Sequence, residues 1–137
     1  MGNYSFAGEN RPMQILILSD RLMEQAKVLA DFFNGLEDFH VIGIAENAPQ
    51  ALQLAENNRI DYLIISGYLR LEETYRVIAE LQKWDKKLLT VHWAILDTLI
   101  DIFCHRYKIP LKFERTLPME DFAGFLKEHR NDGLYKK

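Results

Sequence analysis

The chain alternates five times between a short apolar run and a segment with helical spacing. The first run, at 13–20, reads MQILILSD, and unbroken apolar character of this kind is typical of a parallel strand covered on both faces. In the next segment, 21–36, apolar residues between Ala26 and Phe33 recur at helical spacing, and Gly35 stands where a helix ends. The pattern predicts a strand followed by an amphipathic helix.

The same cycle continues to the end of the chain. Right-handed crossovers return each helix over the sheet, so strands that alternate with helices form one parallel sheet covered on both faces. The sequence therefore predicts an α/β fold with a five-stranded parallel sheet. The further strands are expected at 39–46, 61–66, 87–94 and 111–116, and the further helices at 48–58, 71–84, 94–107 and 119–129.

Length and composition indicate a single domain. The 137 residues are 48% hydrophobic, which is enough to bury one core. We expect the folded domain to span 13–130, with loose tails at 1–12 and 131–137. No segment is apolar enough over a sufficient length to predict a membrane span or a signal peptide.

Charge and cysteine content narrow the function classes. A formal net charge of -3 gives no general attraction to nucleic acid or to an anionic membrane. Cys104 is the only cysteine, so no intrachain disulfide can form, and the reducing cytoplasm is the expected location. The sequence has no metal-binding spacing such as CxxC or HExxH, and we expect neither a metal nor a cofactor.

Functional residues of an open parallel sheet are expected beyond the carboxyl ends of its strands. These ends are therefore the first place to look for a site. The residues at the predicted ends are Ser19 and Asp20, Ser66 and Gly67, His92 and Trp93, and Arg115 and Thr116.

The segment VIGIAENAPQALQLAENNRIDYLIIS at 41–66 resembles the second-strand to third-strand region of the receiver domains of two-component response regulators. ILILSD at 15–20 is similar to the first strand of that family, LEETYRVIAEL at 71–81 to its third helix, and FERTLPMEDF at 113–122 to the segment before its last helix. The resemblance covers about 13–129. It implies the flavodoxin-like, CheY-like (βα)5 arrangement and a role in signal transduction.

The resemblance also implies a phosphorylation site that this chain has lost. Receivers carry two acidic residues after the first strand and a phosphoaccepting aspartate after the third, which together hold Mg²⁺. Here Ser19 replaces the first acid, Asp20 keeps the second, and Ser66 stands at the acceptor position. A serine hydroxyl without an adjacent base is a weak nucleophile, and a site with two carboxylates fewer loses most of its charge.

Other family positions are altered as well. His92 aligns with the threonine or serine after the fourth strand, or Trp93 does if the loop slips by one residue. Arg115 aligns with the family lysine. The resemblance thus implies a pseudo-receiver with a remnant pocket formed by Ser19, Asp20, Ser66, His92 and Arg115. The remaining substitutions are Thr116 for the proline, Lys112 for the aromatic switch residue, and Leu69 and Arg70 for a methionine-proline pair.

Each pocket residue has two interpretations. Asp20 either binds a cation or caps the first helix, where aspartate is favoured. Ser66 is either modified by another enzyme or a hydrogen-bonded filler. His92 is either pH-sensitive or bonded to nearby backbone or to Asp20. Arg115 either holds an anion or pairs with Asp20.

The segment 94–107 has more apolar residues than one buried helix face needs. The surplus predicts an exposed contact surface, and the resemblance implies the same because receivers commonly dimerise through this region. A wider core contact is the alternative. One stripe comprises Ile95, Leu99, Ile102 and Phe103, and the second, which we predict as the interaction face, comprises Leu96, Ile100, Phe103 and Tyr107.

These observations predict an atypical receiver domain that signals through protein contacts, without conventional aspartyl phosphorylation and without enzymatic activity. We expect a protein partner and a homodimer formed through 94–107. Three alternatives stay open: a small-molecule or anion sensor that uses Ser66, His92 and Arg115, a phosphotransfer protein with relocated chemistry, and a receiver domain cut from a longer transcriptional regulator.

Overall fold

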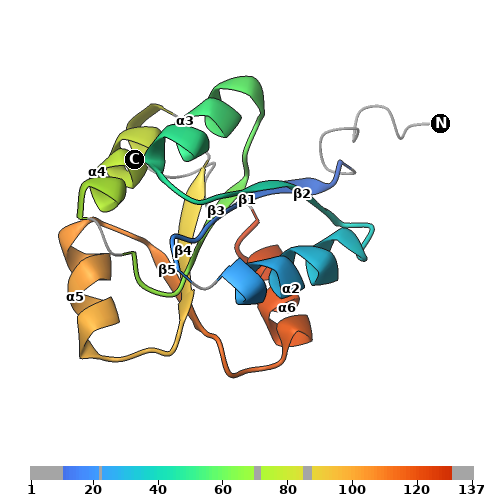
Figure 1. Cartoon of the computed structure of the whole chain (residues 1–137). Coiled ribbons are helices and arrows are strands. Elements are labelled where there is room, and N and C mark those ends of the chain that lie inside the picture. Colours follow the sequence, from blue (N-terminus) through green and yellow to red (C-terminus); the bar gives the residue numbers. More distant parts are fainter. Residues whose placement is uncertain (1–10, 22, 70–71, 85–87, 131–137) are drawn as a thin grey trace.

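The computed structural model describes residues 11–21, 23–69, 72–84 and 88–130. Strands and helices alternate throughout this part of the chain, as the sequence predicts (Figure 1). The elements are β1 (Met13–Leu18), α2 (Met23–Asn34), β2 (Phe39–Ala45), α3 (Ala48–Asn57), β3 (Tyr62–Ser66), α4 (Glu72–Trp84), β4 (Leu89–Ala94), α5 (Thr98–Arg106), β5 (Leu111–Glu114) and α6 (Met119–Glu128).

Two predictions fall largely or wholly outside the described residues. Of the predicted tails at 1–12 and 131–137, only Arg11 and Pro12 are described. Arg70, which aligns with a family position after the acceptor, is also outside this range.

The five strands form one parallel sheet in the order β2-β1-β3-β4-β5, which confirms the predicted fold class. Figure 1 shows α2 and α6 on one side of the sheet and α3, α4 and α5 on the other. The carboxyl ends of parallel strands meet at one edge, so residues that follow β1, β3, β4 and β5 are brought together there.

Both faces of the sheet are buried, which explains the unbroken apolar character of the strands. Successive side chains of a strand point to opposite faces. In β1, Ile15 and Ile17 join the core beneath α2 and α6, and Leu16 and Leu18 join the core beneath α3, α4 and α5.

The two cores differ in their aromatic content. Phe122 of α6 packs edge-on against Phe33 of α2 and is stacked with Trp93 of β4 in the first core. In the second core the ring of Tyr75, from α4, is stacked against both Phe103 and Tyr107, with ring centroids 4.7 Å and 5.0 Å away. Offset and edge-on aromatic pairs of this kind stabilise beyond their buried area.

The fourth predicted helix begins later than expected. Ala94 is the last residue of β4, and Asp97 caps α5 by accepting a hydrogen bond from the backbone N–H of Ile100 at 3.0 Å. The apolar run 94–107 concealed this boundary because it continues from the strand into the helix. Ile95 and Leu96 therefore lie in a loop and not on a helical stripe.

Within the described residues, no helix combines the length and apolar character needed to cross a membrane.

Candidate functional site

A row of side chains crosses the carboxyl edge of the sheet. Ser66, the last residue of β3, pairs in register with Trp93 of β4. Leu18 pairs with Ile65, so Ser19 follows at the level of Ser66. By the alternation along each strand, Ser19, Ser66 and Trp93 point toward α2 and α6.

The acceptor position is closed to solvent. The side chains of Ser19 and Ser66 are both fully buried. Neither hydroxyl has a hydrogen-bond partner within the part of the chain that the structure describes. A phosphoryl donor therefore meets no exposed nucleophile at Ser66.

His92 lies on the opposite face of the sheet from this row. It pairs with Ile65, and its Nε2 atom is 3.0 Å from the hydroxyl oxygen of Tyr75 in α4. The predicted placement of the His92 side chain in a pocket with Ser19 and Ser66 is wrong, because a one-residue step along a strand reverses the direction of the side chain. The residue beside Ser66 is Trp93, which matches the family position only if the loop slips by one residue.

His92 is linked through the Tyr75 hydroxyl to the backbone of Leu69, while its Nδ1 atom has no hydrogen-bond partner among the described residues. The observed partner is thus Tyr75, and not backbone or Asp20 as predicted. Burial lowers the pKa of His92 from 6.5 to about 4, so the imidazole is neutral near pH 7. Burial raises the pKa of the Tyr75 phenol above its ordinary value, although the hydrogen bond from Leu69 opposes the rise, and the charge of Asp20 adds to it. The protonated phenol accepts from the Leu69 backbone N–H at 3.3 Å and is placed to donate to Nε2 of His92.

Asp20, which is half-buried, acts electrostatically on the same group of residues, because its charge contributes to the raised pKa of Tyr75. Within the described residues, no group of three or more His, Cys, Asp or Glu side chains is arranged to hold a metal ion. The acidic cluster that would bind Mg²⁺ in a receiver is thus not assembled around Asp20 by those residues.

Arg115 follows β5 and lies at the same edge as Ser66. Its backbone N–H donates to the carbonyl of Ala94 at 2.9 Å, which continues the pairing of β4 with β5. Among the residues that the structure describes, the hydrogen-bond partner of its guanidinium is the side-chain oxygen of Gln25 in α2. The predicted pairing of Arg115 with Asp20 is therefore not the contact observed.

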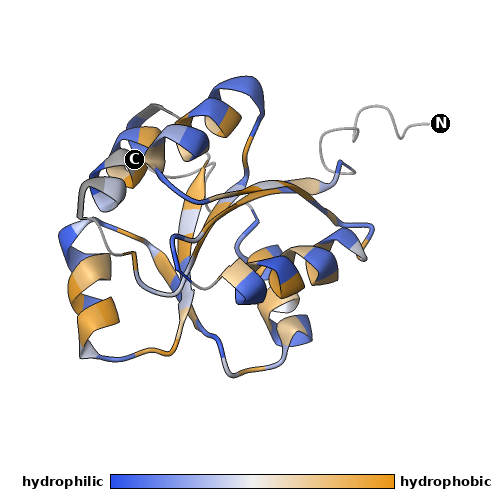
Figure 2. Ribbon diagram, viewed as in Figure 1, coloured by the Kyte–Doolittle hydropathy of each residue, from blue (hydrophilic) through white to orange (hydrophobic). Residues whose placement is uncertain are grey.

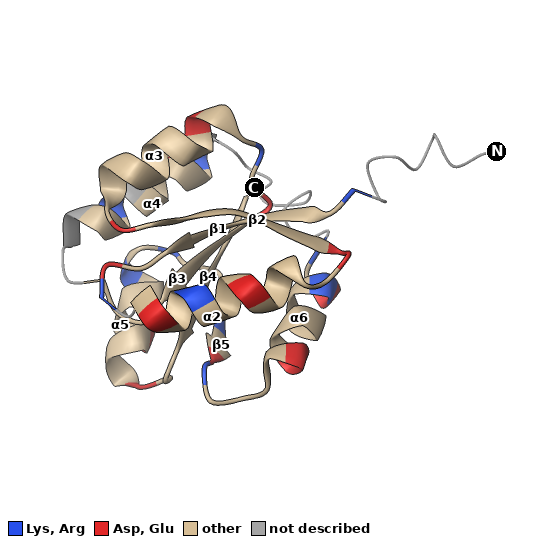
Figure 3. Cartoon of the chain, turned by 45° about the vertical axis from the view of Figure 1, so that its right-hand side comes forward, with Lys and Arg blue, Asp and Glu red and all other residues tan. Residues whose placement is uncertain are grey.

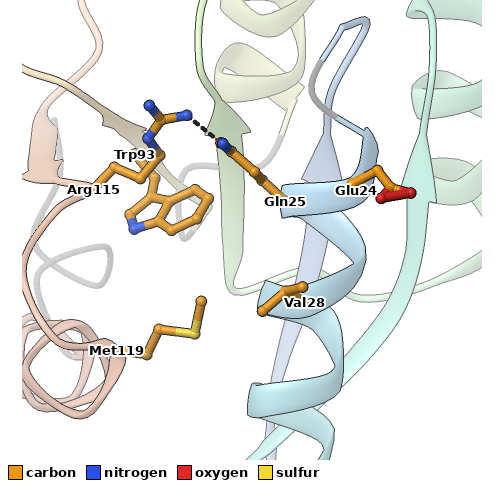
Figure 4. Close-up of a pocket in the computed structure, with 6 residues that line it drawn as sticks. All are labelled: Glu24, Gln25, Val28, Trp93, Arg115 and Met119. Carbon is orange, nitrogen blue, oxygen red and sulfur yellow. Dashed lines mark hydrogen bonds between the residues drawn. The ribbon is translucent and has the colours of Figure 1, made fainter.

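A pocket opens between α2, the end of β4 and the segment after β5 (Figure 4). Its volume is about 340 Å³. The sequence identified only Arg115 and, as an alternative, Trp93. The α2 side was missed because only the register and packing of the helix bring it there, although Val28 stands out as an apolar residue beyond the buried stripe of that helix. The lining residues are Glu24, Gln25, Val28, Trp93, Arg115 and Met119.

The apolar surplus of α5 is exposed, but on the other stripe from the one predicted. Ile95, in the loop before α5, and Leu99 and Ile102, on α5, are 50%, 44% and 43% exposed, and we call these three residues the α5 patch. Figure 2 shows the hydrophobic colouring along this helix. The assignment of Ile100 to the interaction face is wrong because its side chain is fully buried.

The rest of the predicted interaction face is partly buried. Phe103 and Tyr107 pack against the second core, and Leu96 is half-buried in the loop before α5. One stripe therefore makes a wide core contact and the other leaves an apolar surface, whose role as a contact surface stays a prediction.

Charged residues of both signs are interspersed on the visible face of the molecule (Figure 3). On α2, for example, Lys27 stands between Glu24 and Asp31. A surface of this kind has no single-sign field on that face to attract a polyanion.

No known family model matches the sequence, and no curated protein matches it. Solved structures, in contrast, match the fold of the chain. The signal receiver domain of an HD domain-containing protein from Pseudomonas fluorescens matches with a TM-score of 0.73 and 16% identity over 91% of each chain. A CheY-like receiver domain from Methanospirillum hungatei matches with a TM-score of 0.68 and 17% identity over 90% of this chain and 98% of the other.

A third match is the CheX-CheY-BeF3-Mg+2 complex from Borrelia burgdorferi, with a TM-score of 0.69 and 17% identity over 92% of each chain. These similarities confirm the predicted resemblance at the level of the fold. The chain has the CheY-like fold of response regulator receiver domains.

Proposed function

We propose that this chain is a receiver-like signalling domain that acts through protein contacts and not through aspartyl phosphorylation. The observation that carries the proposal is the state of the acceptor position. Ser66 is fully buried and lies between Ser19 and Trp93. Phosphoryl transfer to a receiver needs an exposed carboxylate and a bound cation at this position instead.

The chemistry of the residues around Ser66 supports this proposal. Serine attacks phosphorus only when a base removes its proton, and the residues beside it in register are a second serine and an indole. His92, the nearest base in the sequence of β4, is directed to Tyr75 on the opposite face. We therefore assign no catalytic role to the domain.

The α5 patch supports contact as the mode of action. Three large apolar side chains exposed together on one short segment form a surface that association would remove from water. A helix face pairs readily with its own copy about a two-fold axis, because the same patch then serves both partners. We propose a homodimer through α5, located in the cytoplasm as the single cysteine suggests.

Sedimentation over a concentration series tests this contact. The native chain should dimerise, and a variant with Leu99→Glu and Ile102→Glu should stay monomeric, because dimerisation would bury two carboxylates without partners. Val28→Glu is the matched control: Val28 is 56% exposed and lies on α2, across the sheet from α5. It should dimerise like the native chain.

Adding Mg²⁺ and beryllofluoride to each sample distinguishes a contact that is independent of phosphorylation from one that phosphorylation controls. An association that the additives leave unchanged supports a contact that is independent of phosphorylation. A monomer that associates only when both additives are present would contradict the proposal.

A further inference from the structure

The pocket between α2, β4 and β5 has the size of a small-molecule site. Its volume of about 340 Å³ lies near the lower end of the range found for ligand pockets. That space corresponds to roughly ten to fifteen non-hydrogen atoms and is too small for a dinucleotide. The pocket lies across the sheet from α5, so the proposed contact through α5 makes no use of it.

The walls of the pocket are apolar and extend from the surface into the core. Val28 at its outer side is 56% exposed, whereas the indole of Trp93 at its inner side is only 3% exposed. In Figure 4 the ring of Trp93 and the thioether of Met119 lie on one side of the space and Val28 lies on the other. A flat or chain-like apolar group fits between an aromatic ring, a thioether and a branched side chain.

The polar groups are concentrated at one end. Figure 4 shows the guanidinium of Arg115 meeting the amide of Gln25 beside the Trp93 ring, while the side chain of Glu24 is directed away from that ring. The partner of Arg115 there is neutral, so this hydrogen bond does not neutralise the positive charge. A guanidinium has five N–H donors in a planar fork that suits a carboxylate.

The indole ring of Trp93 carries one more hydrogen-bond donor, its Nε1–H group. Trp93 Nε1 is buried and has no hydrogen-bond partner in the described part of the chain. In Figure 4 this nitrogen lies on the edge of the ring away from Gln25 and Val28, so it reports on a ligand beside the ring without contacting the polar end of the pocket.

We propose that this pocket binds a small organic carboxylate, with its apolar body against Trp93, Met119 and Val28 and its carboxylate on Arg115 and Gln25. The ligand replaces or bridges the bond between Arg115 and Gln25, which links β5 to α2. Binding therefore ties the two elements together through the ligand. The proposal does not rest on dimerisation or on the loss of phosphorylation.

Titration with 3-phenylpropionate tests the proposal, with the indole N–H signal of Trp93 as the readout in proton–nitrogen correlation spectra. Trp93→Phe assigns that signal against the signal of Trp84. We expect saturable binding with a Kd of roughly 1 mM, as is usual for a ligand of this size. The uncharged amide, 3-phenylpropionamide, and inorganic phosphate should each bind at least about tenfold more weakly, since one lacks the charge and the other the apolar body.

Arg115→Gln should weaken binding of 3-phenylpropionate at least about tenfold, because the charged donor is lost. Arg76→Gln on α4 makes the same change in net charge across the sheet and should leave the Kd unchanged. Failure of 3-phenylpropionate to bind would overturn the proposal. The proposal would also be overturned if the amide or inorganic phosphate bound as tightly as the acid. A Kd for the acid that Arg115→Gln leaves unchanged would overturn it as well. If an aromatic peptide side chain binds where the free acid does not, the pocket is a protein-docking site instead.

Discussion

His92 and Trp93 are neighbours in β4 and are both buried, yet they belong to different halves of the molecule. His92 points to the α4 side, where its Nε2 atom meets Tyr75 and the Tyr75 oxygen meets the backbone of Leu69. Trp93 points to the α2 side, where it lies beside Ser66 and lines a pocket that opens to solvent.

The contrast indicates what each face of the carboxyl edge is for. On the His92 side the imidazole Nε2 atom bonds the Tyr75 hydroxyl and aromatic rings pack around it, although His92 Nδ1 and the Thr90 hydroxyl lack partners among the described residues. On the Trp93 side two serine hydroxyls and an indole N–H lack hydrogen-bond partners among the described residues. Both faces therefore contain unsatisfied polar groups, and they differ in access: Trp93 lines a pocket that opens to solvent, which points to function on that face.

The largest effect that tests this contrast is expected from Trp93→Ala. The substitution removes a ring that is stacked with Phe122 and leaves a cavity at the base of the pocket. It should lower the free energy of unfolding by about 3–5 kcal/mol, measured by urea denaturation. Trp93→Phe keeps a ring in place and should cost less. A loss below about 1 kcal/mol for Trp93→Ala would show that the indole is not a packed part of the core.

The next effect is the pH dependence of stability that His92 imposes. Because burial lowers its pKa from 6.5 to about 4, the unfolded chain binds a proton in this window and the folded chain does not. Stability is therefore full above pH 6.5 and falls by about 1.4 kcal/mol per pH unit, or by roughly 3 kcal/mol in total, as the pH drops to 4.

Urea midpoints between pH 7 and pH 4 measure this slope. His92→Phe removes the titrating group and should flatten the His92 contribution, leaving only the slope due to carboxylates. Identical slopes for the native chain and His92→Phe would mean that the imidazole is not held neutral by the fold.

The smallest of the three effects is expected from Tyr75→Phe, which removes only the hydroxyl that joins Leu69 to His92. Two buried polar groups then lose a partner, and the free energy of unfolding should fall by about 1–3 kcal/mol. Tyr68→Phe is the matched control because the Tyr68 hydroxyl bonds Asp97 in an exposed position. It should cost under about 1 kcal/mol, so equal losses in the two variants would argue against a buried network.

Much of this architecture could be predicted from the sequence. Unbroken apolar runs such as 13–18 mark strands buried on both faces, and helical spacing between them fixes the order of the elements. The carboxyl edge followed from the topology alone, so Ser66 and Arg115 were correctly expected there.

The remaining features depend on single-residue geometry that a pattern does not contain. A register difference of one residue decides whether His92 or Trp93 lies beside Ser66. The capping of α5 by Asp97 decides that Ile100 is buried and that Leu99 is exposed. Gln25 and Val28 reach the pocket only because α2 packs over β4, and no motif in the sequence marks them.

The proposed loss of phosphoryl chemistry at Ser66 is best tested by proton–nitrogen correlation spectra of the native chain, recorded before and after addition of Mg²⁺ and beryllofluoride together. With a buried serine at the acceptor position and an indole beside it, the backbone signals of Ser66 and Trp93 should not move. Saturable shifts at Ser66 and Trp93 that require both additives would show that the edge still assembles a phosphoryl site, and would contradict the proposal that this domain is a contact module.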